Sequence, residues 1–111
     1  MSKRTNRLLL EDILATVSKI ELYVFGIDKA HFLKDGTTVD AVTRHLQIIG
    51  EAAGRLPVEF TDGHPEIEWR NIAGLRNRIV HEYFGVDSEL VWEIVRTNLP
   101  ELKKSLEGLL D

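Results

Sequence analysis

Residues 38–56 read TVDAVTRHLQIIGEAAGRL, and their apolar side chains follow a helical period. Successive apolar positions are separated by 3, 4, 3, 4 and 3 residues, and they are Val39, Val42, Leu46, Ile49, Ala53 and Leu56. Such spacing places one apolar stripe along a helix and suits packing at a shallow angle, in a bundle or between subunits. Pro57 is expected to close this helix, because a proline ring clashes with the preceding helical turn.

The segments on either side carry the same period. Residues 10–24 form an apolar stripe that stops before Gly26, and residues 29–33 can add one short helical turn. A third helix is expected to begin within residues 65–69 and to end within residues 83–85, where a glycine can terminate it.

A fourth helix is predicted in the last quarter of the chain. Asp87 or Ser88 can cap it, and its apolar positions run from residue 90 to residue 110. Pro100 must kink or restart it. No repeat and no strand alternation is visible. The expected fold is therefore all-α, an up-and-down bundle of four main helices in a single domain, residues 1–111.

The composition narrows the class of protein. The 111 residues include no cysteine, 14 basic residues and 18 acidic residues, for a formal net charge of −4. The lack of cysteine excludes disulfides and thiolate metal sites and suits a reducing cytosol. No apolar run reaches the roughly 18 residues of a membrane span, and the polar start lacks the apolar region of a signal peptide. We therefore expect a cytoplasmic protein without a membrane partner. Its acidity excludes a broad basic face, so any nucleic acid must be held by a small local cluster or with a partner's help.

Arg76 stands out within the predicted third helix. On a wheel of 100° per residue, it is flanked within about 60° by apolar and aromatic positions. These positions are Trp69, Ile72, Ala73, Ile79, Val80 and Tyr83. Burial of a lone guanidinium costs several kcal/mol or more, so Arg76 needs a carboxylate, a phosphate or a water-filled cleft. Two interpretations stay open: a structural ion pair with an acid on a neighbouring helix, such as Glu51, or an anion site for a phosphate.

Asn77 and His81 lie four positions apart and would share another face of this helix. The asparagine could then hold the tautomer and orientation that a histidine needs as a general base. The alternative is a polar histidine near a helix end, where the helix dipole favours it. Arg76 and His81 diverge by about 140° on an ideal helix. Either the last turn deforms, or two copies meet about a two-fold axis and complete each other's site, which predicts a homodimer or a higher oligomer.

The run GLRNRIVHEYFGVD (residues 74–87) resembles the HEPN family, and specifically its HepT branch. The signature of that branch is Arg, four residues, His, one residue, Tyr, and it is matched without departure by Arg76, His81 and Tyr83. The polar residue expected after the arginine is present as Asn77. The flanking runs that agree are HLQIIGEAA (45–53), WRNIAG (69–74) and VWEIV (91–95). The resemblance covers nearly the whole chain, most weakly over the first 30 residues.

The resemblance implies a HEPN-like bundle with the motif at the C-terminal end of the third helix and a homodimer around the motif. It implies a metal-independent endoribonuclease without a cofactor, the toxin of a type II/VII-like toxin–antitoxin pair. The cognate antitoxin would be a minimal nucleotidyltransferase that attaches AMP to Tyr83, and transfer RNA is one class of target. His81 would act as the base on the RNA 2′-OH, which DNA lacks, and Arg76 would stabilise the phosphate.

Supporting roles and alternatives remain beside this interpretation. Asn77 and Glu51 are candidate supporting residues, although Glu51 falls on the polar side of its own helix, where a solvated position is expected. No metal is expected, because the histidines lack ligand spacing; they are His31, His45, His64 and His81. The alternatives to an enzyme are a non-catalytic module that binds a nucleotide or docks a nucleotidyltransferase, and a purely structural dimeric bundle.

Overall fold

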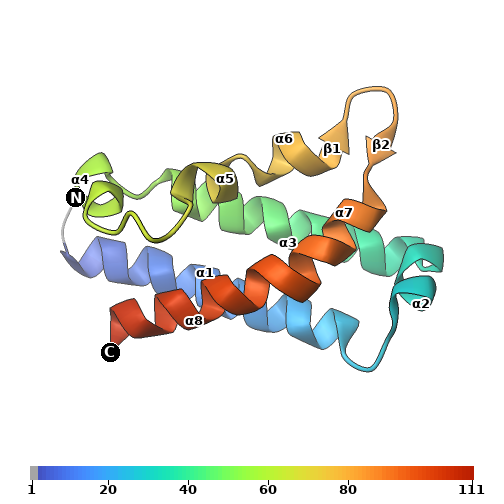
Figure 1. The fold of residues 1–111 in the computed structure, drawn as a ribbon, viewed down its shortest axis with the longest axis horizontal. Coiled ribbons are helices and arrows are strands. Elements are labelled where there is room, and N and C mark those ends of the chain that lie inside the picture. The colour runs from blue at the N-terminus through green and yellow to red at the C-terminus, as the bar shows by residue number, and fades with distance from the viewer. Residues whose placement is uncertain (1–2) are drawn as a thin grey trace.

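The computed structural model describes residues 3–111 of the chain. In chain order the elements are α1 (Lys3–Val24), α2 (Lys29–Lys34), α3 (Gly36–Gly54), α4 (Val58–Asp62), α5 (Trp69–Ala73), α6 (Leu75–Ile79), β1 (Val80–His81), β2 (Gly85–Val86), α7 (Ser88–Glu93), the π-helical turn η1 (Ile94–Asn98) and α8 (Leu99–Leu110). Figure 1 shows four antiparallel passes: α1, α3, the α5–α6 segment, and α7 to α8. The predicted all-α, up-and-down bundle is therefore confirmed, with a two-stranded hairpin added to it.

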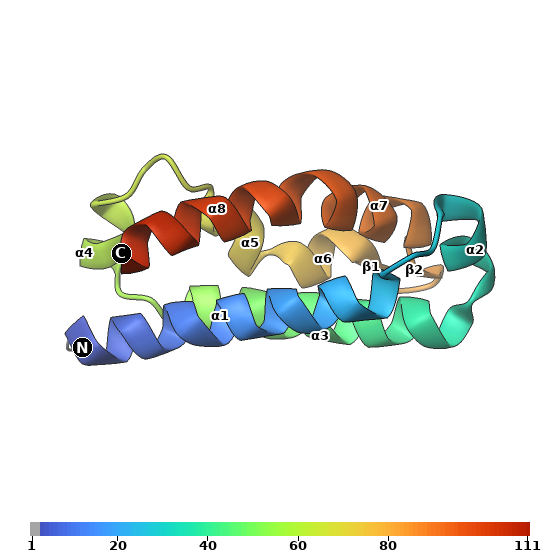
Figure 2. The ribbon, with the colours of Figure 1, turned by 90° about the horizontal axis from the view of Figure 1, so that it is seen from below.

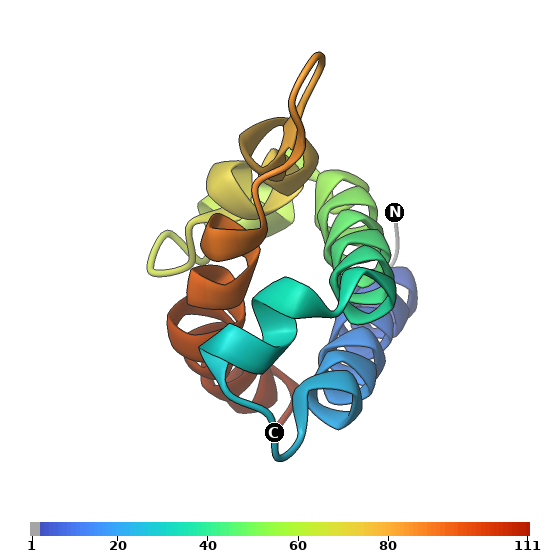
Figure 3. The same cartoon turned by 90° about the vertical axis from the view of Figure 1, so that its right-hand side faces the viewer.

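The passes are arranged in two layers. In Figure 2, α1 and α3 form one layer, and α5 to α8 lie above it. Figure 3 shows α2 crossing one end of the bundle between the layers. There the buried ring of Phe32 packs against Trp92 with ring centroids 5.1 Å apart. None of the helices in the described part of the chain combines the length and the apolar character needed to cross a bilayer.

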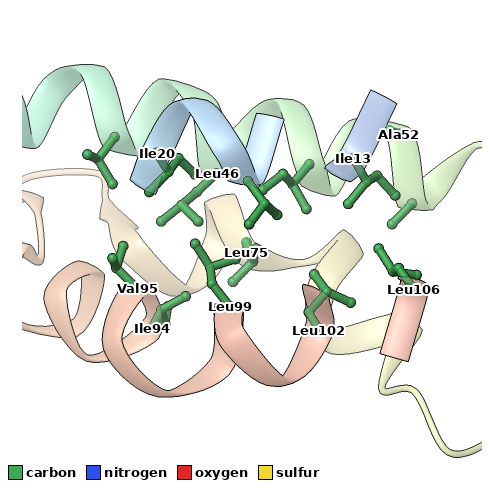
Figure 4. Packing of buried hydrophobic residues seen from close by; sticks show 14 of the residues in the cluster. Ile13, Ile20, Leu46, Ala52, Leu75, Ile94, Val95, Leu99, Leu102 and Leu106 are labelled. Atoms are coloured by element: carbon green, nitrogen blue, oxygen red, sulfur yellow. The ribbon is translucent and has the colours of Figure 1, made fainter. Parts of the chain in front are cut away.

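The core lies between these layers, as the periodic spacing predicts. In Figure 4, Ile20 and Leu46 lie on one side of the core, and they face side chains of the other layer such as Leu75 and Leu99. All six apolar positions predicted for residues 38–56 are buried: Val39, Val42, Leu46, Ile49, Ala53 and Leu56. Burial of one such side chain contributes about 1.5–3 kcal/mol, which makes this shared core the main support of the helices.

Helix boundaries follow the local chemistry. The Asp35 side chain accepts hydrogen bonds from the Thr38 hydroxyl (2.7 Å) and the Thr38 amide (3.1 Å), which caps α3 and lowers the pKa of that carboxyl. Asp87 caps α7 by accepting from the Leu90 amide at 3.1 Å, as expected. Pro100 stands at the start of α8 and has no N–H to donate to the turn before it. The last pass therefore widens into η1 and restarts, which confirms the predicted interruption.

The third pass differs from the prediction of one helix ending within residues 83–85. It is divided at Gly74, and its helical part ends at Ile79. The Ile79 carbonyl would accept from Tyr83 in a continued helix, but it accepts instead from the Asp87 amide at 2.7 Å. The chain between them folds into the β1–β2 hairpin, whose turn uses the positive φ of +76° at Gly85. The end of the predicted third helix is thus wrong, and two of the motif residues lie beyond it.

Candidate functional site

A close approach between α3 and α5 sets the position of the motif. A Cβ added at Gly50 would lie 2.9 Å from the Ile72 carbonyl oxygen and 3.3 Å from that of Ala73. Only glycine allows the two backbones to meet at this distance. The helix that follows, α6, is therefore held beside the polar face of α3.

This contact brings together three of the predicted site residues. Glu51 from α3 and Arg76 and Asn77 from α6 line one shallow pocket of about 200 Å³. The remaining lining residues are Gln47, Gly50 and Ala73. The exposure predicted for Glu51 is confirmed, yet its carboxylate lies on the side of α3 that faces the motif arginine.

Arg76 itself is exposed, so the prediction that it lies in a buried apolar face is wrong. The buried side of α6 is centred between Leu75 and Ile79, which leaves Arg76 roughly 80° to one side. Within residues 3–111 no carboxylate forms an ion pair with its guanidinium, and no hydrogen bond engages it. The structural ion pair with Glu51 is therefore not formed, and the guanidinium is available to an anion from solution.

His81 lies on β1 rather than on the helix, so Asn77 does not lie one helical turn before it. The helical spacing on which the orienting role of Asn77 was argued is therefore absent within one chain. The imidazole is half exposed, and its Nε2 lies 3.9 Å from an Asp87 side-chain oxygen. Asp87 is held in place by the hydrogen bond that its backbone N–H donates to the Ile79 carbonyl and by the one that its side chain accepts from the Leu90 amide. A carboxylate fixed in this way can orient the imidazole ring.

Asp87 is the site residue that sequence reasoning missed. It was interpreted only as a helix cap, because the chain from Trp69 to Gly85 was expected to be one helix. The signal that could have found it is Gly85, since a glycine between two short segments that contain Val80 and Val86 is typical of a hairpin turn. A hairpin there places His81 and Asp87 side by side.

Tyr83 stands in the hairpin turn and is 86% exposed, beside Phe84, which is 90% exposed. Figures 1 and 3 show the hairpin projecting from the bundle. No hydrogen bond of the Tyr83 hydroxyl is present among the described residues, so this oxygen is open to reaction partners. Its position on the wheel, close to Arg76, does not apply once the helix has ended.

The motif segment is locally basic in an acidic protein. Residues 70–84 contain three arginines and a single acid, Glu82, whereas the whole chain has a net charge of −4. Arg76 and Arg78 are both exposed on α6. An exposed guanidinium recognises phosphate oxygens, and a half-exposed imidazole beside a carboxylate can transfer a proton. In one chain, however, His81 does not line the pocket that holds Arg76.

Other candidate ligand sets are sparse. Nowhere in the described residues do three or more His, Cys, Asp or Glu side chains gather as ligands for a metal ion. Two of the remaining histidines have structural contacts: the ring of His45 packs edge-on against Tyr23, and that of His64 packs against Phe60.

The amino-acid sequence matches a family of known proteins. The profile of the family described as "Ribonuclease HepT-like" matches residues 13–109. A protein of Thermococcus cleftensis named "Probable ribonuclease HepT" is 42% identical over 107 residues, which cover 96% of this chain and 97% of that protein. A protein of Caldanaerobacter subterraneus subsp. tengcongensis named "Putative RNase TTE0752" is 40% identical over 107 residues, 96% of each chain.

No solved structure matches the chain significantly. The family match nevertheless includes α3, the whole motif segment and the capped start of α7. It also agrees with the resemblance carried by Arg76, His81 and Tyr83. The chain therefore belongs to the HepT-like ribonuclease family of HEPN proteins.

Proposed function

We propose that this protein is a metal-independent endoribonuclease, with Arg76 as its phosphate-binding group and His81 as its proton-transfer group. The observation that carries the proposal is the exposed, unpaired guanidinium of Arg76 in the same motif segment as a half-exposed imidazole backed by Asp87. The names of its relatives, as ribonucleases, support an activity on RNA.

The reaction uses the nucleophile that RNA itself carries. His81 removes the proton of a 2′-OH, and the resulting oxygen attacks the adjacent phosphorus. The guanidinium of Arg76 stabilises the negative charge that builds up on the phosphate oxygens. The bond from phosphorus to the 5′-oxygen then breaks, a proton is transferred to that oxygen, and a 2′,3′-cyclic phosphate remains.

We further propose that the working site is shared between two protomers. Arg76 and His81 of one chain do not line a common pocket, and a two-fold axis at the motif would set the arginine of one chain against the histidine of the other. The imidazole that has taken the proton of the 2′-OH can then return it to the leaving 5′-oxygen, so one His81 is sufficient for each site. Asn77 and Glu51 line the Arg76 pocket and are proposed to position the phosphate end of the substrate.

The chemistry predicts which substrates are cleaved. Single-stranded RNA is expected to be cut in the presence of EDTA, and mass spectrometry should find a cyclic phosphate at the 3′ end of the upstream fragment. An oligonucleotide with one cleavable position changed to 2′-deoxy should lose the cut at that position alone, because the nucleophile is missing. All-DNA strands should stay intact.

Three results would contradict this function. Cleavage that stops with EDTA and returns with a divalent ion would place a metal in the reaction. Equal cutting at a deoxy position would exclude attack by the 2′-OH. Binding of every RNA without cleavage of any would favour the alternative, a non-catalytic nucleotide-binding or nucleotidyltransferase-docking module.

Tyr83 is proposed as the regulatory residue of a toxin–antitoxin pair in the cytoplasm. Its exposed hydroxyl is accessible to a minimal nucleotidyltransferase, which would attach AMP there and silence a ribonuclease that acts on transfer RNA or another RNA. A phosphate at Tyr83 adds negative charge beside the cationic motif and would repel substrate.

Intact mass spectrometry after co-expression with a nucleotidyltransferase tests the regulation. We expect a mass increase equal to one or more AMP groups, and its loss in Tyr83→Phe. The matched control is Tyr23→Phe, since Tyr23 is also partly exposed but lies on α1. An addition that persists in Tyr83→Phe would assign the modification to another residue.

A further inference from the structure

Phe84 is an almost fully exposed aromatic side chain that lies within the motif segment, which Phe25 does not. It is 90% exposed, the highest exposure among the large apolar side chains of the described residues. Burial of an exposed phenyl ring is favourable, because it removes apolar surface from water. We therefore expect a binding partner to cover an exposed ring that lies in the motif segment.

The hairpin fixes this ring beside the proposed proton-transfer group. The Phe84 amide donates to the His81 carbonyl at 3.3 Å and closes the turn, and Gly85 with φ +76° follows directly. Backbones linked across such a turn have Cα atoms within about 7 Å of each other. The backbone of Phe84 therefore lies beside that of His81, and its exposed ring is carried by the same turn as the proposed proton-transfer group.

The charge around the hairpin indicates the kind of partner. The exposed guanidiniums of Arg76 and Arg78 precede the hairpin, and Glu82 is the one acid in residues 70–84. Exposed aromatic rings next to arginines bind unpaired nucleobases, because the ring stacks on the base while the cations hold the backbone.

A second copy of the chain fits this ring less well as its occupant. One aromatic side chain buries 150–250 Å², so Tyr83 and Phe84 together offer roughly 400 Å². A stable interface needs about 800 Å² from each partner. The two rings at the hairpin tip alone are too small to hold a dimer together, so the proposed dimer must rest on other contacts around the motif and does not require the ring of Phe84.

We propose that Phe84 stacks on an unpaired base beside the cleaved phosphodiester, so that the enzyme selects single-stranded or looped RNA. This inference rests on the proposed function, because it takes RNA as the molecule bound at the motif. Bases within a duplex are already stacked on both faces and offer no surface to the ring, which gives the site its preference.

Binding of a single-stranded RNA oligonucleotide with 2′-O-methyl groups tests the proposal. The probe cannot be cleaved, and a 2-aminopurine base within it reports stacking by its fluorescence. Phe84→Leu keeps an apolar side chain but removes the ring, and it is expected to weaken binding roughly tenfold. Phe84→Trp should restore the affinity and the fluorescence change. Neither variant should alter binding to duplex RNA.

Phe25→Leu is the matched control, because Phe25 is a phenylalanine of similar exposure, 85%, that follows α1 directly in the chain. The C-terminal end of α1 lies far from the hairpin in Figures 1 and 3. Phe25→Leu should bind the probe as the wild type does. The proposal is overturned if Phe84→Leu binds as tightly as Phe25→Leu. It is also overturned if Phe84→Leu sediments as a smaller species at equal concentration, since a second copy would then cover the ring.

The ribonuclease function and the stacking role of Phe84 can be contradicted separately. Binding that depends on Phe84, in a protein that cuts no RNA, would exclude the ribonuclease function and leave the stacking role in place. Cleavage of RNA with unchanged rate and affinity in Phe84→Leu would support the ribonuclease and remove the stacking role.

Discussion

Replacing His81 with alanine is expected to lower the rate of RNA cleavage by about 10²–10⁴-fold, the range supplied by a positioned general base. Folding should be unchanged, because the side chain is 48% exposed and is not part of the buried core. The measurements are the single-turnover rate of cleavage on one labelled RNA and the thermal unfolding midpoint. Unchanged cleavage by a folded His81→Ala protein would end the proposed mechanism.

His31→Ala and Asp87→Asn make this experiment specific. His31 is an exposed histidine on α2, away from the motif, and its replacement should not change the rate. In Asp87→Asn the side-chain oxygen that caps α7 is retained, since asparagine is as good a cap as aspartate. Only the charge that faces His81 is lost, so the rate should fall less than in His81→Ala, with no change in stability.

The sequence predicted the bundle well because helical periods report burial directly. All six apolar positions of residues 38–56 are buried, Asp87 caps α7, and Pro100 falls where the last pass restarts. These features depend on neighbours within one or two turns of the chain. Local chemistry is sufficient to fix them.

The site was harder to predict because its geometry depends on where a helix stops. A single wheel through residues 69–83 assigned Arg76 to the buried face, but the break at Gly74 and the extended backbone at Val80 change the phase. Leu75, which is not among the positions that flank Arg76 on that wheel, is a core residue. Periodicity predicts which face of a helix is buried much better than it predicts the residue at which the helix ends.

The meeting of Glu51 with Arg76 and Asn77 could not be read from either helix alone. It requires the approach of α5 to α3 that Gly50 permits, which is a contact between segments distant in the chain. The helical wheel of α3 correctly predicted that Glu51 is exposed. It could not predict which residues of another helix lie next to Glu51. Tertiary packing, rather than local preference, decides such pairings.

Mixing two inactive variants is expected to restore activity if the site is shared between protomers. Arg76→Ala alone should lose about 10²–10³-fold, the usual cost of removing one group that stabilises transition-state charge. His81→Ala alone should lose its activity as argued above. After the two proteins are unfolded together in equal amounts and refolded, the mixture should recover about a quarter of the wild-type rate.

The quarter follows from two-fold symmetry. Half of the dimers are mixed, and each mixed dimer contains one site with both substitutions and one site with neither. If Arg76 and His81 instead acted together within one chain, every site in the mixture would carry one substitution and no activity would return. A mixture of the wild-type chain with the Arg76→Ala, His81→Ala double variant reverses the comparison. Its mixed dimers contain one complete site if both groups come from the same chain, and none if the two groups come from different chains. The pair of mixtures therefore decides between a site within one protomer and a site across two, whichever RNA is used as the substrate.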